Sequence, residues 1–193
     1  MNSILVTPPA LEPITLAEAR QHLNISEADG DDDYVTALIM VARQACEDQT
    51  NLSLLTQTRR GFAERFDSVM SLSRSPVQSV SSVNYYDTDN VLQTVSTDDY
   101  FFVNGGAHGR IGFVDDYSFP DVYKRPDAVQ VEYVAGFGDA ASDVPSPIRH
   151  AMLLLIGTWY AQRESISAEE LREVPNAVQF LLSPHRVFDG MLP

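Results

Sequence analysis

An apolar run at residues 147–164 predicts the central helix of the chain. Its apolar side chains recur at spacings of three and four residues, the periodicity of one helix face. That stripe consists of Ile148, Met152, Leu155, Ile156 and Trp159, and it is widened by Leu153, Leu154 and Tyr160. We expect Ser146 to cap this helix and Pro147 to lie in its first turn, where proline has no donor to lose. A helix that is apolar nearly all round is packed on several sides, so we expect it to contact the rest of the chain, neighbouring subunits, or both.

Two shorter helical patterns lie near the N-terminus. Thr15 and Glu18 have the spacing of a capping box, which predicts a helix from Thr15 to about Asn24. A second helix is predicted for residues 31–50, because three aspartates at its start favour the positive end of the helix dipole. Its apolar face is formed by Val35, Leu38, Ile39, Ala42, Ala45 and Cys46. Residues 26–30 are expected to form a linker between the two helices.

From about residue 55 the apolar period changes from 3.6 to 2, which is typical of strands. Strands are predicted at residues 58–66, 77–86, 100–103, 110–114 and 128–134. Tight turns are expected at residues 85–91 and 104–106. No helix-length segment separates these strands, so we expect an antiparallel sheet and not a doubly wound parallel one.

The predicted fold class is therefore α+β, a small helical bundle with an inserted antiparallel β module. We expect residues 1–54 and 145–193 to form the bundle and a C-terminal tail. Residues 55–144 are expected to form the β module and its connecting loop. A final short helix should open at Pro175 and end at Pro184.

Composition narrows the possible functions. The net charge is −14, and such an acidic chain would repel nucleic acid instead of gripping its phosphates. The single cysteine, Cys46, lies on an apolar helix face and is expected to be a core residue. No secretory signal is present at residues 1–9, so a reducing cytoplasm is expected. No membrane partner is expected, because a span needs about 20 apolar residues and Arg149 and Arg163 bracket the apolar run of the central helix too closely.

Three sequence features resemble catalytic or ligand-binding motifs, and each departs from the pattern that its chemistry needs. Asp29, Asp31 and Asp33 resemble the start of a calcium loop, but the required glycine and glutamate are absent. The glycines at residues 136–138 lack the following helix of a dinucleotide site. The histidines show no paired ligand spacing; they are His22, His108, His150 and His185.

These departures lead us to expect no catalytic residue, no metal and no cofactor. For His108, which lies in a glycine-rich turn, a role in that turn is the preferred interpretation. An enzyme whose site is assembled in space from Asp, Glu and His side chains of the β module, for example with Asp115 and Asp116, is an alternative hypothesis.

The order of several short motifs is more informative than any one of them. They are Pro-Ile-Thr-Leu-Ala-Glu-Ala at residues 13–19, Ser-Pro-Val-Gln-Ser-Val at 75–80, Val-Glu-Tyr-Val-Ala-Gly-Phe at 131–137, Val-Pro-Ser-Pro-Ile at 144–148 and Leu-Leu-Ser-Pro-His-Arg at 181–186. Together they resemble head–tail connector (adaptor) proteins of tailed phages, whose relatives are encoded by prophages and gene transfer agents. The resemblance covers nearly the whole chain. His185 departs from it, since a tyrosine is expected at that position.

The resemblance implies a structural virion protein at the portal–tail junction that assembles in the host bacterial cytoplasm. It implies a homo-oligomeric ring, expected to be a dodecamer, beneath the portal protein. Such a ring extends the DNA channel without binding the genome specifically and joins the head to a stopper or tail-terminator protein. A tail-completion or tail-tube component of the same particle is the alternative within this class.

The resemblance also implies candidate interface residues. The C-terminal segment of relatives docks on the portal, and the corresponding candidates are Val178, Leu181, Leu182, Arg186, Val187 and Phe188. The surplus apolar surface of the central helix predicts subunit contacts, for which the candidates are Leu154, Trp159, Tyr160 and Arg163.

Overall fold

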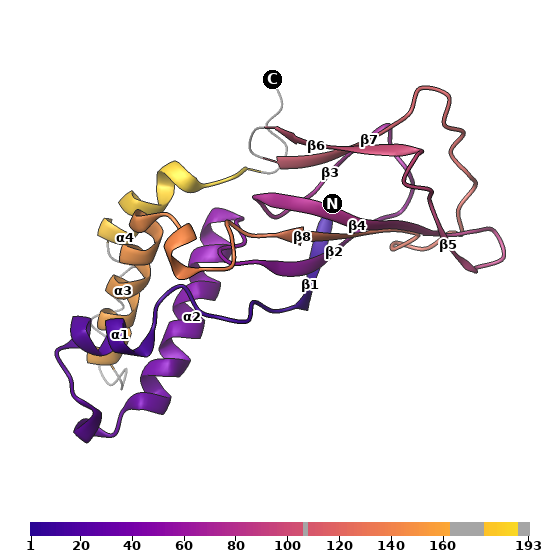
Figure 1. Cartoon of the computed structure of the whole chain (residues 1–193). Coiled ribbons are helices and arrows are strands. Elements are labelled where there is room, and N and C mark those ends of the chain that lie inside the picture. Colours follow the sequence, from indigo (N-terminus) through magenta and orange to yellow (C-terminus); the bar gives the residue numbers. More distant parts are fainter. Residues whose placement is uncertain (106–107, 163–175, 189–193) are drawn as a thin grey trace. The chain divides into compact units, whose positions relative to one another are not determined.

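The computed structural model describes residues 1–105, 108–162 and 176–188 (Figure 1). The chain divides into two compact units. The sheet unit consists of Met1–Pro9, Thr56–Phe137 and Val187–Pro193, and the helix unit consists of Ala10–Leu55 and Gly138–Arg186. The predicted α+β class is confirmed, with helices in one unit and antiparallel sheets in the other.

The sheet unit contains two sheets. The larger has the strand order β1 (Asn2–Thr7), β2 (Gln57–Ala63), β8 (Val129–Ala135), β4 (Val77–Tyr86) and β5 (Leu92–Thr94). The smaller has the order β3 (Val69–Ser71), β7 (His108–Phe113) and β6 (Tyr100–Gly105). All strand pairs within the described residues are antiparallel.

The N-terminal segment differs from the sequence prediction. Residues 1–54 were expected to lie in the helical bundle, but Met1–Pro9 belong to the sheet unit. The physical reason is that β1 forms a ladder with β2, in which Ile4 lies opposite Arg60. Three consecutive aliphatic residues in β1 hide the period of two on which the prediction relied. The strands β3 and β5 were missed because each has only three residues.

The core of the sheet unit lies between its two sheets. Buried side chains come from both of them: Met70 and Ile111 from the smaller, and Val83, Val131 and Tyr133 from the larger. The sheets therefore pack face to face, as in a β-sandwich. The central strand β8 is the most buried, because it pairs with β2 on one side and β4 on the other.

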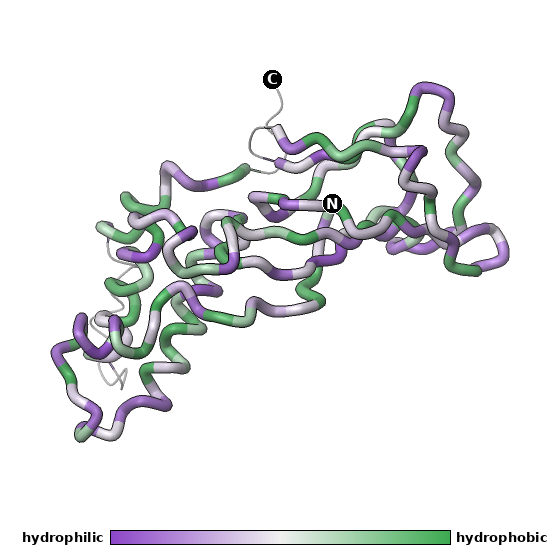
Figure 2. The backbone as a smooth tube through the Cα atoms, in the orientation of Figure 1, coloured by the Kyte–Doolittle hydropathy of each residue, from purple (hydrophilic) through white to green (hydrophobic). Residues whose placement is uncertain are grey.

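The helix unit is built around the predicted central helix. Its elements are α1 (Leu16–Leu23), η1 (Glu27–Asp29), α2 (Asp32–Thr50), η2 (Ala141–Asp143), α3 (Ser146–Ala161), α4 (Asn176–Leu182) and η3 (Ser183–His185). Helix α3 contacts α1, α2 and α4, and it buries Ile148, Ala151, Met152, Leu155 and Ile156. Figure 2 shows hydrophobic and hydrophilic stretches alternating along α2, as expected for a helix with one buried face.

The ends of two helices follow the predicted signals. At the start of α1, the Glu18 amide donates to Thr15 Oγ1 at 3.2 Å, and the Thr15 amide donates to Glu18 Oε2 at 2.9 Å. The backbone hydrogen bond from Thr15 holds the pKa of Glu18 below its usual range, and Arg149 contributes in the same direction. Asn24 and Asn51 end α1 and α2 in the left-handed conformation.

Other boundaries differ from the prediction. Helix α3 begins at Ser146, so Pro145 and not Ser146 occupies the N-cap position. The predicted linker contains η1, which is stabilised because the Ser26 amide donates to the Asp29 carboxylate at 2.6 Å. The predicted C-terminal end of the central helix at Glu164 lies outside the described residues.

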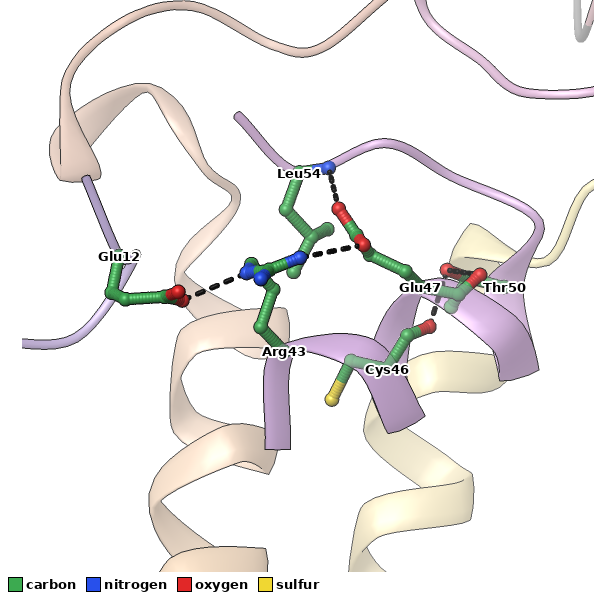
Figure 3. Close-up of polar contacts among 6 residues, drawn as sticks. All are labelled: Glu12, Arg43, Cys46, Glu47, Thr50 and Leu54. Carbon is green, nitrogen blue, oxygen red and sulfur yellow. Dashed lines mark hydrogen bonds and ion pairs between the residues drawn. The ribbon is translucent and has the colours of Figure 1, made fainter. Parts of the chain in front are cut away.

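A buried ion-pair network lies near the C-terminal end of α2 (Figure 3). Arg43 Nε donates to Glu12 Oε2 at 2.8 Å, and Arg43 Nη1 donates to Glu47 Oε2 at 3.1 Å. The other oxygen of Glu47 accepts from the Leu54 amide at 2.9 Å. Both Arg43 and Glu47 are only 6% exposed. The network therefore ties the segment before α1 and the segment after α2 to this helix, through charged groups that have partners despite their burial.

Replacing Glu47 with alanine should destabilise the helix unit. The substitution leaves the buried Arg43 with one carboxylate partner and leaves the Leu54 amide without its acceptor, so we expect a loss of about 3 kcal/mol in the free energy of unfolding. Chemical denaturation measures this value. Gln44→Ala, an exposed position on the same helix, is the matched control and should change the value by less than about 0.5 kcal/mol. Equal values for the two variants would contradict the role of the network.

Replacing Tyr133 with phenylalanine should stabilise the sheet unit. The Tyr133 side chain is fully buried, and its hydroxyl has no hydrogen-bond partner among the described residues. Removing an unpaired buried hydroxyl should raise the free energy of unfolding by about 1 kcal/mol. Tyr133→Ala, which opens a cavity, should lower it by about 4 kcal/mol. A loss of stability in Tyr133→Phe would show that the hydroxyl is paired.

Candidate interaction surfaces

The predicted subunit-interface residues lie at the C-terminal half of α3. Leu154, Trp159 and Tyr160 are all half-buried in the helix unit, and Arg163 lies outside the described residues. Half-burial within one chain leaves part of each side chain available to a partner. These positions stay predictions for a subunit contact.

Contacts between α3 and α2 hold two of these residues in place. The Tyr160 hydroxyl donates to the Asp31 carboxylate, and the Tyr34 hydroxyl donates to the Trp159 carbonyl at 3.4 Å. The rings of Tyr34 and Tyr160 have centroids 6.1 Å apart. The aromatic group is therefore preorganised, which lowers the entropy cost of using it in an interface.

A second apolar feature of α2 was missed in the sequence analysis. Tyr34, Met40 and Val41 are 36, 44 and 47% exposed. Tyr34 and Val41 are seven residues apart and so share one helix face. The seven-residue spacing of Tyr34 and Val41 can be seen in the sequence. It does not stand out, because the buried face with Val35, Leu38 and Ile39 already accounts for the amphipathic pattern of this helix.

The predicted portal-interface residues fall into two structural groups. Val178 and Leu182 are 0 and 1% exposed, because α4 packs this face on α3 and α2. Their side chains hold α4 in the helix unit. Leu181 and Val187 are half-buried, whereas Phe188 is 57% exposed.

Arg186, another member of this predicted set, contacts α2. Its Nε donates to the Gln49 carbonyl at 2.9 Å, in the last turn of that helix. A cationic side chain at this point satisfies a terminal carbonyl and favours the negative end of the helix dipole. Beside it lies an open depression of about 300 Å³, lined by Gln49, Gln179, Leu182, Ser183 and Arg186.

Phe180 is the most exposed large hydrophobic side chain of α4, at 78%. It was absent from the predicted set because that set followed the stripe of Val178, Leu181 and Leu182. An aromatic residue off the buried stripe of a short helix was a usable signal, since exposed aromatic residues are enriched at interfaces. The Phe180 side chain and the neighbouring depression form what we call the α4 surface.

Four of the positions considered as candidates for chemistry make contacts or are buried within the described residues. Asp29 caps η1, and Asp31 accepts from Tyr160. His108 lies in β7, with Nδ1 3.3 Å from the Leu72 carbonyl and Nε2 3.1 Å from the Phe188 carbonyl. Cys46 is buried, and desolvation raises the pKa of its thiol to about 12.

Among residues 1–105, 108–162 and 176–188, no group of three His, Cys, Asp or Glu side chains has an arrangement that could hold a metal ion. In the same part of the chain, every helix is too short or too polar to cross a membrane.

Comparison with known proteins shows what the chain resembles. Residues 13–100 match the family model described as the Phage gp6-like head-tail connector protein. The predicted resemblance to head–tail connectors is confirmed. The matched segment begins at the Pro-Ile-Thr motif that caps α1 and extends to the first residue of β6. No curated protein sequence matches the chain.

Solved structures match over nearly the whole chain. A chain in the neck of an empty gene transfer agent (GTA) particle, computed with C6 symmetry, has a TM-score of 0.79 and 23% identity, and the match covers 97% of this chain and 96% of that one. A chain in the virion of a native gene transfer agent particle has a TM-score of 0.77 and 24% identity over the same shares of the two chains. A chain in the neck of the native particle, computed with C12 symmetry, has a TM-score of 0.76 and 23% identity over the same shares of the two chains. These likenesses show that the fold, including both units, is shared with neck chains.

An aspartate should destabilise the fold at position 178 but should be tolerated at position 180. Val178→Asp places an unpaired charge in the contact of α4 with α3, so we expect a loss of about 3 kcal/mol or more in the free energy of unfolding. Phe180→Asp adds the same charge two residues away on an exposed site and should change stability by less than about 0.5 kcal/mol. Chemical denaturation of both variants measures these changes and tests whether α4 has a buried face at Val178 and an exposed face at Phe180.

Proposed function

We propose that the protein is a head–tail adaptor of a tailed phage or gene transfer agent particle. In this proposal it forms a ring beneath the portal, extends the DNA channel and carries the stopper or tail. The observation that carries the proposal is the connector-family match at residues 13–100, together with a fold shared with neck chains over 97% of the protein. A structural role, and not catalysis, is what both matches point to.

The subunit contacts of the ring are proposed to use the aromatic group of the helix unit. Tyr34, Trp159 and Tyr160 are partly exposed and held by hydrogen bonds, and Val41 continues the apolar surface along α2. A ring needs heterologous contacts that join two different surfaces of each copy. The C6 and C12 symmetries of the related necks support a ring of twelve copies.

The portal contact of the helix unit is proposed to use the α4 surface. Phe180 is 78% exposed, whereas Val178 and Leu182 are buried and hold α4 in place. Phe188 of the sheet unit, which is 57% exposed, stays a separate candidate for a portal contact. Burial of an aromatic side chain in a partner pocket is a frequent source of binding energy. The acidic chain, with its net charge of −14, suits a conduit through which DNA moves without being held.

The central experiment combines particle imaging with binding to the portal. Electron microscopy of particles should place the chain between portal and tail, and particles made without it should accumulate as heads that lack tails. Purified protein should bind isolated portal. Binding to tail proteins with no binding to portal would support the tail-completion alternative and overturn the adaptor proposal.

Two variants test the proposed contacts while the chain remains folded. Trp159→Asp should lower the yield of portal-bound rings about tenfold, because it leaves an unpaired charge in an apolar subunit contact. Ala161→Asp, an exposed position on the same helix, is the control for the added charge and should assemble normally. Mass measurement of the portal complex reads out both. Circular dichroism must show folded monomer for each variant, and normal rings with Trp159→Asp would remove this helix face from the interface.

A further inference from the structure

Each sheet of the sheet unit ends in one long edge strand and one short one. The long edges are β1 and β6, with six residues each, and the short edges are β3 and β5, with three residues each. Among the described residues, no strand pairs with the outer side of β1 or β6. In the view of Figure 1, these two strands lie on different sides of the unit.

The two long edge strands lack the charged residues and prolines that often protect an edge strand. Neither Asn-Ser-Ile-Leu-Val-Thr nor Tyr-Phe-Phe-Val-Asn-Gly contains a charged residue or a proline. Natural proteins place lysine, proline or a covering segment at such edges, because unpaired backbone groups recruit other strands. The irregularity at Val6 is confined to one end of β1.

The edge strands β1 and β6 also carry exposed apolar side chains. Ile4, Leu5 and Val6 are 52, 43 and 42% exposed in β1. Phe101 and Val103 are 52 and 47% exposed in β6. A strand added to either edge would therefore gain main-chain hydrogen bonds and bury apolar surface at the same time, which is the basis of recognition by strand addition.

We propose that β1 of one copy pairs with β6 of the next copy, so that the sheets continue from subunit to subunit around the ring. A second copy is the occupant that the observations favour, since the two edges are equal in length, uncharged and located on different sheets. Copies that each carry a net charge of −14 repel one another except where neutral surfaces meet. Two different edges on one chain also provide the heterologous contact that a closed ring needs. This inference rests on the proposed function for the ring itself.

Lysine substitutions test the two edges in portal-bound rings. Leu5→Lys and Val103→Lys should each lower ring yield about tenfold, because an edge lysine opposes strand pairing. The matched control is Leu92→Lys on the short edge β5, which removes an aliphatic side chain of similar exposure, 50%, and adds the same charge. Thermal unfolding should be alike for all three monomers. Ring yields of both edge variants equal to the control would overturn the inference.

Engineered cysteines test which edges meet. Copies with Ile4→Cys, mixed with copies that carry Phe101→Cys or Val103→Cys, should form a disulfide-linked heterodimer under mild oxidation. The native Cys46 does not compete, because it is buried and its thiol pKa is raised to about 12. A homodimer from Ile4→Cys copies alone would show two-fold pairing of β1 with itself and overturn the proposal, as would the absence of any mixed dimer.

The outcomes separate this inference from the adaptor function. Rings that assemble normally in particle necks with both lysine variants would leave the adaptor function standing and remove the strand pairing. Mixed disulfides in a protein that particle imaging does not find at the neck would support the strand pairing and overturn the adaptor function.

Discussion

The pairing of Arg43 with Glu47 near the end of α2 is the constraint on which the organisation of the chain depends. The chain passes between its two units four times, and the first two crossings lie at Pro9–Ala10 and Leu55–Thr56. Glu12 and Leu54, which lie next to these points, are both hydrogen-bonded to this pair. The network costs desolvation energy that its hydrogen bonds must offset. Its structural consequence is that both crossing segments are anchored to the same helix.

The motifs that resemble head–tail connectors owe much of their character to internal packing. In residues 13–19, Thr15 and Glu18 form the capping box, and the Pro13 carbonyl accepts from Arg149 at 3.0 Å. Near the other end of the chain, Leu182 is buried and Arg186 binds the last turn of α2. These two motifs therefore help to specify the helix unit of this chain, whereas the motifs at residues 75–80 and 131–137 lie in its sheet unit. The residues free to contact partners, such as Phe180, lie beside the motifs and outside the buried pattern.

The two units provide different kinds of surface. The helix unit offers a preorganised aromatic group and an exposed phenylalanine, which suit contacts based on side-chain burial. The sheet unit offers two neutral edges with free backbone groups, which suit strand addition. In the proposed ring, contacts by side-chain burial and contacts by strand addition are therefore assigned to different units of the chain. The net charge of −14 favours solubility and opposes non-specific association of copies.

The sequence by itself determined the four α-helices and five of the strands, which are β2, β4, β6, β7 and β8. Local signals suffice for these features: the capping box at Thr15, the apolar period of α3 and the alternation in β8. Tertiary structure alone decided that β1 joins the sheet unit, since its three consecutive aliphatic residues have no period and are held by a partner some 55 residues away. It also decided which side of α4 is buried and which is free, because burial depends on the helix that packs against it. The physical reason is the same in both cases. Hydrogen bonding and packing between distant segments depend on both partners, so the residue pattern of one segment does not reveal them.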